Sequence, residues 1–390
     1  MEDLLKKSIH ELADLHFLCS CGKEHRVDIH DITVGHGVLP KIVEILKKFE
    51  VRHPYLLADK NTYALCGKTV QNHLTAAGQY ELHSHIFSGD SVLIPDEKAV
   101  GAALLDMEPK DDLILAVGSG TLNDIARILS ARTGVPYMII GTAPSMDGYA
   151  STVSPLIIGG TKITKEAVYP IAVLADTSIL REAPTQMMTA GYGDIIGKFT
   201  ANTDWRLSQM LTGEYYCKES AALINEATQK CADNAEEFAR RDEKAVGLVT
   251  EALILSGVAM GMVGNSRPAS GAEHHLAHYW EINALKEHRE HALHGNAVAV
   301  GTVVIASLYD LAADLLPKEL ERPTASEIIA LLKKCGAPTH PSEIGVEKEL
   351  FYQSILHAME IRERYTILRF CQAKGKLSEF AEVLTKKFYP

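Results

Sequence analysis

The feature that most constrains the fold is a regular alternation of two patterns over the first half of the chain. Apolar runs typical of buried strands, such as "HPYLLAD" and "DDLILAVGSG", are each followed by a segment with helical periodicity, such as "TLNDIARILSARTG". Strands that alternate with helices at this spacing predict a mostly parallel, Rossmann-like sheet with helices on its faces.

The second half of the chain has a different pattern. After "YPIAVLADTSILREAP", long segments rich in Ala, Leu, Met and Glu continue with helical periodicity to Pro390 and carry almost no strand signal. A chain of 390 residues is also long enough for its core to divide in two. We therefore predict an α/β domain over residues 1–177 and an all-α domain over residues 178–390.

Composition excludes several classes of protein. We find no apolar run of the about 20 residues that a membrane helix needs, and "MEDLLKKSIHELADL" is typical of an amphipathic helix rather than a signal peptide. Seven cysteines without a paired framework suit a reducing compartment. A net charge of −11 argues against nucleic acid as a partner. We expect a soluble, cytoplasmic protein that binds a small molecule and neither nucleic acid nor membrane.

Two signals for a nucleotide follow predicted strands of the first domain. In "LILAVGSGTLNDIARI" a strand leads through Gly118 and Gly120 to a helix start, where free backbone N–H groups attract phosphate. Asn123 stands where a G-x-G-x-x-G motif has its third glycine, so an ordinary strand-to-helix turn is the alternative. Asp59 ends "HPYLLAD", where it either accepts hydrogen bonds from ribose hydroxyls or caps the next helix.

A loop of small and polar residues, "IIGTAPSMDGYAS", follows the next predicted strand. It carries Thr142, Ser145, Asp147 and Ser151 at the carboxyl end of the predicted sheet. Ligands of open α/β sheets bind at that end, so these side chains are candidates for ligand contacts. A solvated turn is the alternative.

Histidines gather between Ser270 and Gly295, where 26 residues hold six of the 17 in the chain. His274 and His278 are four residues apart and so share a helical face, although spacing does not decide between His274 and His275. His294 heads the apolar run "NAVAVGTVVIASLYDL". Two or three imidazoles and a carboxylate form a divalent metal site with open positions. Asp194 of "GYGD" is the candidate carboxylate, unless it caps a helix.

The order of these motifs carries a family resemblance. The Gly-rich turn, the small-polar loop, "GYGD", "EHHLAH" and "HALHG" resemble the dehydroquinate synthase-like and iron-containing alcohol dehydrogenase superfamily. Within it, "SRPASGAEHHLAHYWE" and "GTAPSMDGYAS" resemble the sn-glycerol-1-phosphate dehydrogenases in their longer bacterial form. The resemblance covers nearly the whole chain and implies a dehydroquinate synthase-like architecture.

The resemblance also implies roles for individual residues. It implies a catalytic metal on Asp194, His274 and His294, with His278 and Asp147 facing the substrate. The implied nicotinamide contacts are Asp59, Gly118, Ser119, Gly120, Thr121, Leu122, Thr142, Ser145 and Ser151. The interval from His274 to His294 is longer than in many relatives, and "INALKEHREH" is the expected insertion.

The activity implied is metal-dependent reduction of dihydroxyacetone phosphate to sn-glycerol 1-phosphate, reversibly, with NADH or also NADPH. Zinc or nickel is the expected metal, His278 the expected proton donor or relay, and a homodimer the expected assembly. Arg267 and Lys198 are the cations nearest the site in sequence, so we predict that Arg267 holds the substrate phosphate. Each could instead form a structural ion pair, and Lys198 is the next candidate.

Three other functions remain open at this point: a polyol (glycerol) dehydrogenase, a dehydroquinate synthase-type lyase and a metal-binding module without activity. The early motif "CSCGKEH" offers Cys19, Cys21 and His25 as metal ligands. Three ligands without a partner pair at finger-like spacing do not complete a zinc site, so we predict a turn with buried thiols there.

Overall fold

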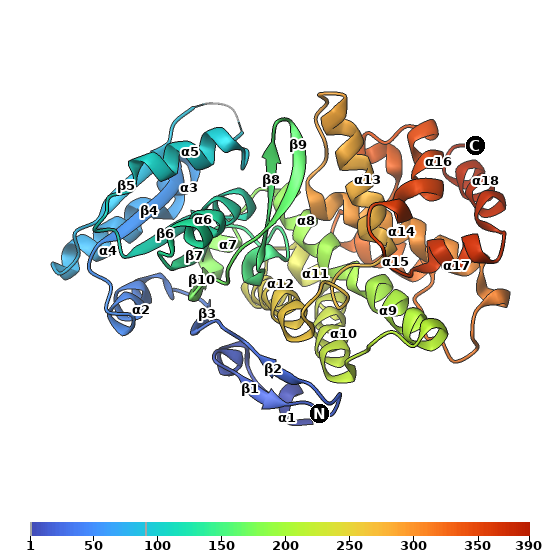
Figure 1. Ribbon diagram of the computed structural model, residues 1–390, viewed down its shortest axis with the longest axis horizontal. Helices are drawn as coiled ribbons and strands as arrows, with labels where there is room; N and C mark the ends of the chain where they lie inside the picture. The colour runs from blue at the N-terminus through green and yellow to red at the C-terminus, as the bar shows by residue number, and fades with distance from the viewer. Residues whose placement is uncertain (1, 90–91) are drawn as a thin grey trace.

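The computed structural model describes residues 2–89 and 92–390 (Figure 1). Its first half is built on a six-stranded sheet whose strands are all parallel and run in the order β3-β10-β7-β6-β4-β5. The strands are β3 (Asp31–Gly35), β4 (Pro54–Asp59), β5 (His83–Phe87), β6 (Leu113–Gly118), β7 (Tyr137–Gly141) and β10 (Ala172–Asp176). The predicted parallel α/β sheet is therefore confirmed.

The sheet is covered on both faces, which explains why its strands read as continuous apolar runs. Successive side chains of a strand point to opposite faces, and in β6 Leu115 packs into one apolar cluster while Ile114 packs into the other. The first cluster includes side chains of α2 (Ile42–Lys48) and α4 (Lys68–Ala77). The second includes side chains of α5 (Glu97–Asp106) and α6 (Gly120–Thr133). The remaining short helices here are η2 (Leu39–Lys41), α3 (Lys60–Thr62), the π-helical turn η3 (Tyr63–Gly67) and η4 (Gly148–Ala150).

An antiparallel hairpin that we did not predict stands at the border of the two halves. It consists of β8 (Val153–Ile158) and β9 (Thr161–Glu166), joined by Gly159 and Gly160. Both glycines have positive φ, 58° and 75°, a conformation that two-residue hairpin turns require. The hairpin reaches from the sheet toward α13 (Ala272–Lys286) in the second half (Figure 1).

The second half is helical throughout, as predicted. Its other helices are α7 (Thr177–Leu180), α8 (Thr185–Ile196), α9 (Lys198–Thr212), α10 (Lys218–Asp233), α11 (Ala235–Ala239), α12 (Glu243–Val263), α14 (His294–Leu311), η5 (Ala313–Leu315), α15 (Ala325–Lys334), η6 (Pro341–Ile344), α16 (Lys348–His357), η7 (Ala358–Glu360), α17 (Ile367–Ala373) and α18 (Leu377–Phe388). α14 is buried along most of its length and packs on α8, α13 and α15. Among the described residues, the last strand of the sheet ends at Asp176 and the first helix of this half begins at Thr177. The domain boundary at residue 177 stays a prediction.

One helix is longer and more apolar than the sequence analysis allowed. Among the described residues, α12 alone has the length and composition of a membrane-spanning helix. Its most apolar window is 67% buried, and the helix packs against α8, α10 and η4. The helix is therefore part of the protein core, because its apolar side chains already have protein neighbours.

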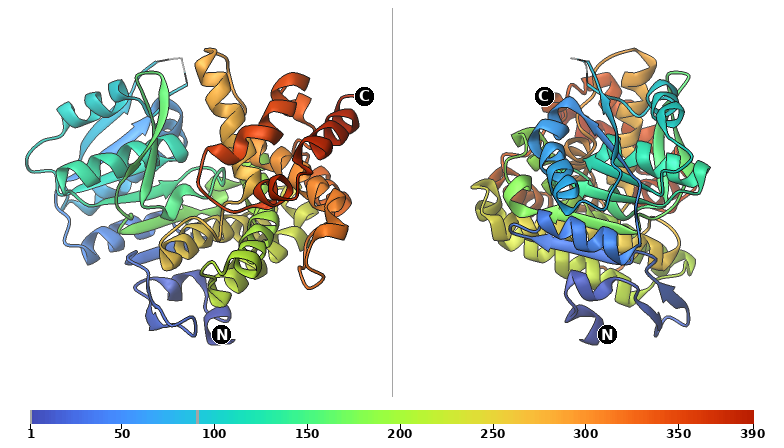
Figure 2. Two further views of the ribbon diagram at one scale, coloured as in Figure 1. Left: turned by 45° about the vertical axis from the view of Figure 1, so that its right-hand side comes forward. Right: turned by 90° about the vertical axis from the view of Figure 1, so that its left-hand side faces the viewer.

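The N-terminal segment differs from the predicted amphipathic helix. It forms α1 (Glu2–Leu5), the 3-10 turn η1 (Ile9–Leu12) and a small antiparallel hairpin of β1 (His16–Leu18) and β2 (Glu24–Arg26). Ser8 and Glu11 form a capping box, which starts a new turn and interrupts a single helix. In this segment α1 packs on α10 and β2 on α12 of the helical half, while η1 packs on the edge strand β3 of the sheet (Figures 1 and 2).

Candidate active site

The structure brings together the three residues that we expect to bind a metal. Asp194 lies in the last turns of α8, His274 in the first turn of α13, and His294 is the first residue of α14. One ligand atom from each lies within 4.8 Å of the others, and Nε2 of His274 is 3.6 Å from Oδ1 of Asp194. Asp194 is fully buried and His274 nearly so. Residues that are 80 and 100 positions apart therefore form one compact site.

Glycines allow the helices that carry these ligands to approach each other. A Cβ added to Gly295 would lie 1.9 Å from the carbonyl oxygen of Ala190, and one added to Gly193 would lie 2.5 Å from the carbonyl oxygen of Gly295. Any side chain at either position would push α8 and α14 apart. The "GYGD" and "HG" motifs thus place Asp194 next to His294.

A buried carboxylate orients His274. Oε1 of Glu273 is 2.8 Å from Nδ1 of His274 and also accepts a hydrogen bond from the backbone of Gly271, while Oε2 accepts one from Thr200. A carboxylate on Nδ1 favours the tautomer that leaves Nε2 unprotonated and free to bind a metal. The sequence analysis did not identify Glu273, although a carboxylate directly before a candidate ligand was the available signal.

The structure also separates the two neighbouring histidines that spacing could not separate. His274 faces Asp194, whereas both ring nitrogens of His275 are buried without a hydrogen-bond partner among the described residues. Burial and the nearby cations Arg364 and Arg362 lower the pKa of His275 to about 3. His275 is therefore a neutral core residue at neutral pH.

The residues present fit a divalent metal. Nδ1 of His294 is buried and has no hydrogen-bond partner in the described part of the chain, beside a carboxylate and a second imidazole. Nitrogen and oxygen donors of this kind suit zinc or nickel as well as iron or manganese. Burial lowers the pKa of His294 to about 4, although Asp194 raises it, so the imidazole is neutral at neutral pH, as a ligand must be.

Lys198 and Asp147 lie next to Asp194, one of the three candidate metal ligands. Nζ of Lys198 donates to Oδ1 of Asp194 and to Oδ2 of Asp147, both at 2.7 Å, and the backbone N–H of Asp147 donates to Oδ2 of Asp194. Burial would raise the pKa of Asp194, but Lys198 and the two histidines lower it far below its ordinary value. Lys198 is fully buried between two carboxylates. The structural ion pair that we weighed for Lys198 is thus present.

Arg267 forms the structural ion pair that we weighed as the alternative to a phosphate contact. Its Nε and Nη2 donate to the two carboxylate oxygens of Glu214, Nη1 donates to the carbonyl oxygen of Tyr365, and Nη2 also lies near Ser208. The Arg267 side chain is only 4% exposed. Because these partners already use all three nitrogens of the guanidinium, the geometry gives Arg267 a structural role.

His278 has a different set of charged neighbours. Its Nδ1 is 3.7 Å from Oε2 of Glu281, and its Nε2 is 3.4 Å from Nη2 of Arg362. Glu281 also binds Lys162 of the β8–β9 hairpin at 2.6 Å, so the hairpin is fastened to α13 at the edge of the site. Burial, with Lys162, His294 and Arg362 nearby, lowers the pKa of His278 well below its ordinary value. The imidazole of His278 is therefore neutral at neutral pH.

Sequence reasoning missed these partners of His278 for different reasons. Glu281 follows His278 by three residues, so helical spacing was a usable signal. Lys162 and Arg362 are remote in sequence, and only the fold places them there. His278 also faces the predicted trio, because its ring centroid lies 5.2 Å from that of His294 and 6.2 Å from that of His274.

The residues expected to contact the nicotinamide cofactor end up at the carboxyl edge of the sheet. Gly118 ends β6, Ser119 precedes α6, and the turn continues through Gly120, Thr121 and Leu122 in the first turn of that helix. A Cβ on Gly118 would lie 2.4 Å from Cδ1 of Leu122, so only glycine fits this turn. The backbone N–H of Thr142 donates to the carbonyl oxygen of Gly118 and joins the turn to the loop of Ser145 and Ser151.

Asn123 explains the departure from the third glycine of the motif. Its Nδ2 donates to the carbonyl oxygen of Gly148 at 3.0 Å, and the residue is fully buried. The side chain thus fastens α6 to the loop that carries Asp147. A glycine here could not make this bond.

Asp59 caps a helix, which was the alternative interpretation. Its Oδ1 accepts the backbone N–H groups of Asn61 and Thr62, both at 2.8 Å. Its Oδ2 takes no part in those two bonds, and the residue stays half-buried at the end of β4. Capping therefore leaves one carboxylate oxygen available for a ribose.

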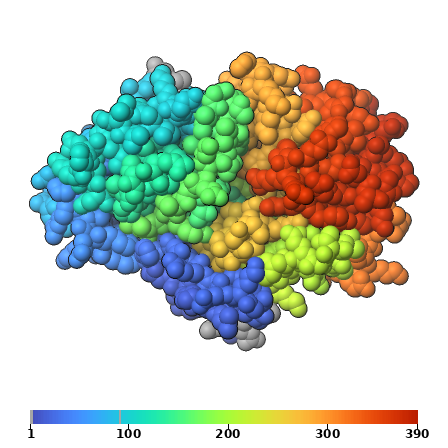
Figure 3. Space-filling view, in the orientation of Figure 1, coloured from blue at the N-terminus to red at the C-terminus, as the bar shows by residue number. Residues whose placement is uncertain are grey.

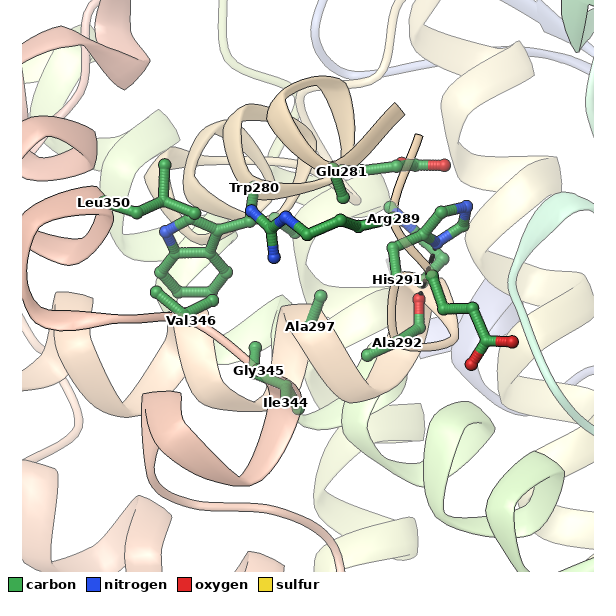
Figure 4. A pocket seen from close by; sticks show the side chains of 14 residues that line it. Trp280, Glu281, Arg289, His291, Ala292, Ala297, Ile344, Gly345, Val346 and Leu350 are labelled. Carbon is green, nitrogen blue, oxygen red and sulfur yellow. Dashed lines mark hydrogen bonds between the residues drawn. The ribbon is translucent and has the colours of Figure 1, made fainter. Parts of the chain in front are cut away.

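The expected insertion "INALKEHREH" is partly helical and partly loop. α13 continues to Lys286, and residues 287–293 lead directly to His294. This loop forms one wall of a pocket lined also by Trp280, Ala297 and Val346, and Figure 4 shows the Arg289 side chain extended across it. His294 and Glu281 line the pocket too, so it adjoins the candidate metal site.

Comparison with known proteins places the chain in a family. Residues 33–184 match the family described as iron-containing alcohol dehydrogenase. The chain is 35% identical to a glycerol-1-phosphate dehydrogenase, NAD(P)+, of Halalkalibacterium halodurans over 376 residues, 90% of this chain and 94% of that protein. It is 35% identical to the enzyme of the same name from Methanosarcina acetivorans, over 87% of this chain and 90% of that protein.

Solved structures agree on the fold. A glycerol dehydrogenase from Schizosaccharomyces pombe aligns with a TM-score of 0.67 at 17% identity, over 91% of this chain and 90% of that one. A maleylacetate reductase from Agrobacterium tumefaciens aligns with a TM-score of 0.69 at 13% identity, over 92% and 97%. The chain belongs to the glycerol-1-phosphate dehydrogenase family, within the iron-containing alcohol dehydrogenase superfamily.

Proposed function

We propose that this protein reduces dihydroxyacetone phosphate to sn-glycerol 1-phosphate with NADH or NADPH, and catalyses the reverse reaction. The observation that carries the proposal is Arg362, a cation beside His278 that lacks an acidic partner within ion-pairing distance in residues 2–89 and 92–390. An unpaired guanidinium next to a metal site is suited to a substrate that carries a phosphate. The names of the relatives support the same activity.

Asp194, His274 and His294 would hold one divalent metal, for which we propose zinc or nickel. When bound, the metal supplies a Lewis acid for the carbonyl group, and the nicotinamide supplies the hydride. Asp59, Gly118 to Leu122, Thr142, Ser145 and Ser151 would hold the cofactor across the carboxyl edge of the sheet. Lys198 and Ser256 both donate to Oδ2 of Asp147. We propose that Asp147 contacts the substrate through its other carboxylate oxygen, Oδ1.

His278 is assigned to the proton that the reduced oxygen needs. Its ring faces the metal trio, and Arg362 and Glu281 fix the ring from either side. A buried ring between two charged side chains is restricted in its orientation toward the substrate. His278 would therefore hold or pass a proton at the substrate oxygen.

The phosphate would lie against two arginines. Burial lowers the pKa of Arg362, and burial with the neighbouring cations Arg267 and Arg362 lowers that of Arg364 to about 10. Arg364 donates to the carbonyl oxygen of Ser270 and to Ser266, but to no carboxylate of residues 2–89 and 92–390. Two guanidiniums in a partly buried site, neither of them ion-paired with a carboxylate among the described residues, favour binding of a dianion. The surface is hollowed where the hairpin, α13 and the C-terminal helices meet (Figure 3).

Changing Arg362 to Gln tests the phosphate site. We expect KM for dihydroxyacetone phosphate to rise by roughly 10 to 100-fold, because a hydrogen bond to a charged group contributes about 1.5–3 kcal/mol. KM for the nicotinamide and the metal content should hardly change. Steady-state kinetics and metal analysis of the purified variant measure these quantities.

The unphosphorylated substrate is the matched control. Dihydroxyacetone lacks the phosphate, so wild type and Arg362→Gln should use it equally poorly. A wild-type protein that prefers glycerol and dihydroxyacetone over their phosphates would be a polyol dehydrogenase instead. A protein that consumes substrate without net oxidation of NADH would be a lyase of the dehydroquinate synthase type.

Cofactor choice gives a second test, at Asp59. Asn keeps the shape and the helix cap but loses the charge, so Asp59→Asn should raise the ratio of kcat/KM with NADPH to that with NADH. We expect roughly tenfold or more, because 1.4 kcal/mol is well within the repulsion of two charges about 4 Å apart near a protein surface. Changing Thr62 to Val removes the hydroxyl that accepts the N–H of Asp59 and should leave the ratio unchanged. An equal ratio in wild type and Asp59→Asn would leave Asp59 as a cap alone.

We also propose that the enzyme is cytoplasmic and forms a homodimer. The described cysteines are all free thiols, which suits a reducing compartment. Size-exclusion chromatography with light scattering measures the mass of the assembly. A mass near 42.6 kDa, that of one chain, would contradict the dimer.

A further inference from the structure

A second cluster of metal-binding side chains shares no residue with the candidate active site. Cys19, Cys21 and His25 of the β1–β2 hairpin meet Cys217, the residue before α10. Sγ of Cys19 is 3.7 Å from Sγ of Cys217, and Nε2 of His25 is 3.3 Å from Sγ of Cys21 and 3.4 Å from Sγ of Cys217. All four ligand atoms lie within 4.8 Å of one another.

These separations match a tetrahedral zinc site. Zinc binds sulfur at about 2.3 Å and imidazole nitrogen at about 2.0–2.1 Å, so the edges of the tetrahedron are about 3.8 Å for two sulfurs and about 3.5 Å for sulfur and nitrogen. The three distances between the cluster atoms agree with these edges. A disulfide between Cys19 and Cys217 would instead bring the two sulfurs to about 2.05 Å.

Two of the sulfurs accept backbone hydrogen bonds, and the imidazole is buried. Backbone N–H groups of Cys21 and Ser220 point at the sulfurs of Cys19 and Cys217, at 3.5 and 3.4 Å. Cys217 also caps the 16-residue helix α10, whose N-terminus favours negative charge. His25 is 1% exposed, and its ring stands edge-on to Phe17 at 5.5 Å. The described residues offer Nδ1 of His25 no hydrogen-bond partner, so Nε2 alone serves the cluster.

A carboxylate lies at the border of the cluster. Glu219 accepts a hydrogen bond from Ser20 and lies 3.3 Å from Sγ of Cys19, which donates its proton there. Binding of a metal to a thiol releases that proton. Ser20 would keep Glu219 in place when the thiol proton is gone.

We propose that Cys19, Cys21, His25 and Cys217 bind a structural zinc ion. Three thiolates and one imidazole select zinc over the hard cations, and four protein ligands leave no open position for a substrate. The ion would join the N-terminal hairpin to α10 across 192 residues of sequence, from His25 to Cys217. Closing so long a loop restricts the unfolded chain, so the ion stabilises the packing of the hairpin on Trp205 and Val263.

The fourth ligand revises the sequence interpretation. The motif "CSCGKEH" supplies three ligands, and we predicted a turn with buried thiols because no partner pair follows it at finger-like spacing. The fold supplies Cys217 from "EYYCKES" instead. No local pattern marks that cysteine as a ligand.

Metal analysis of purified holoprotein tests the proposal. The Cys217→Ala variant should contain about one zinc equivalent per chain less than wild type. Cys66→Ala is the matched control, because Cys66 is an equally buried thiol in the sheet domain outside any ligand cluster of the described residues. It should keep the wild-type zinc content. The Tm of Cys217→Ala should also be lower than that of wild type, whereas the Tm of Cys66→Ala should not.

Cobalt separates this site from the catalytic one. Protein reconstituted with Co²⁺ should show thiolate-to-cobalt charge-transfer absorption in wild type and in His274→Ala, and should lose it in Cys217→Ala. If Cys217→Ala does not fold, Cys21→Ser at the half-exposed edge of the hairpin takes its place and should lose the same absorption. Three results would each overturn the proposal. They are equal zinc content in wild type, Cys217→Ala and Cys21→Ser, no charge-transfer band in wild type, and a Cys19–Cys217 disulfide in the mass spectrum.

Discussion

Changing His274 to Ala should remove the active-site metal and lower kcat/KM by roughly 1000-fold or more, because the metal contributes several kcal/mol to the transition state. His274 is the ligand that Glu273 orients, and it lies between Asp194 and His294. Its loss leaves one carboxylate and one imidazole, too few to hold zinc or nickel tightly. The measurements are metal content and steady-state kinetics of the same preparation.

His275 is the matched control for that experiment. It is the next residue in the same helical turn and is as buried as His274, but it is not grouped with Asp194 and His294, and its ring nitrogens have no hydrogen-bond partner among the described residues. His275→Ala removes the same atoms and should keep the metal, although the cavity will cost some stability. Full metal content and turnover in His274→Ala, or loss of the metal in His275→Ala instead, would contradict the ligand assignment.

Patterns that repeat along the chain predicted the parallel sheet and the helical half. Strands buried on both faces need continuous apolar runs, and "LILAV" and "YMII" have them. The β8–β9 hairpin was missed because its strands alternate charged and apolar residues weakly, and only the pair Gly159 and Gly160 marks its turn. The hairpin is part of the surroundings of the site because it places Lys162 against Glu281 of α13.

Residue type indicated the three candidate ligands that the fold brings together, whereas contacts between remote segments were not predictable. Imidazoles and a carboxylate beside glycines indicated Asp194 and His294, because glycine marks the close approach of two helices. His274 could not be separated from His275 by spacing, since a difference of one residue, about 100° around a helix, decides nothing until the partner helices are placed. Cys217 and Arg362 depend wholly on tertiary contacts.

The two arginines show why closeness in sequence is a weak basis for the phosphate prediction. Arg267 lies seven residues before His274, but its guanidinium turns to Glu214. Arg362 is 84 residues from His278 and reaches its ring. A phosphate needs a cation without an internal partner, and sequence distance carries no information about partners.

Arg267→Met should therefore destabilise the fold and leave substrate binding almost unchanged. Removing one partner of a buried ion pair costs roughly 3–5 kcal/mol, and the lower end applies here because Glu214 is 32% exposed and can be partly hydrated. The carbonyl oxygen of Tyr365 also loses its donor. Denaturant unfolding measures the free energy, and Met keeps most of the side-chain volume, so little of the loss comes from a cavity.

Arg362→Gln should give the opposite pair of results, with a raised KM for dihydroxyacetone phosphate and little change in the free energy of unfolding. Within the described part of the chain, Arg362 has no ion-paired carboxylate that its removal would leave unpaired, and its removal relieves the repulsion with Arg364. If phosphate binds at Arg362 and the Glu214 pair is structural, Arg362→Gln therefore changes KM alone and Arg267→Met changes the free energy of unfolding alone. A higher KM for dihydroxyacetone phosphate in Arg267→Met, with its stability intact, would return the phosphate to Arg267 and require the Glu214 pair to open when substrate binds.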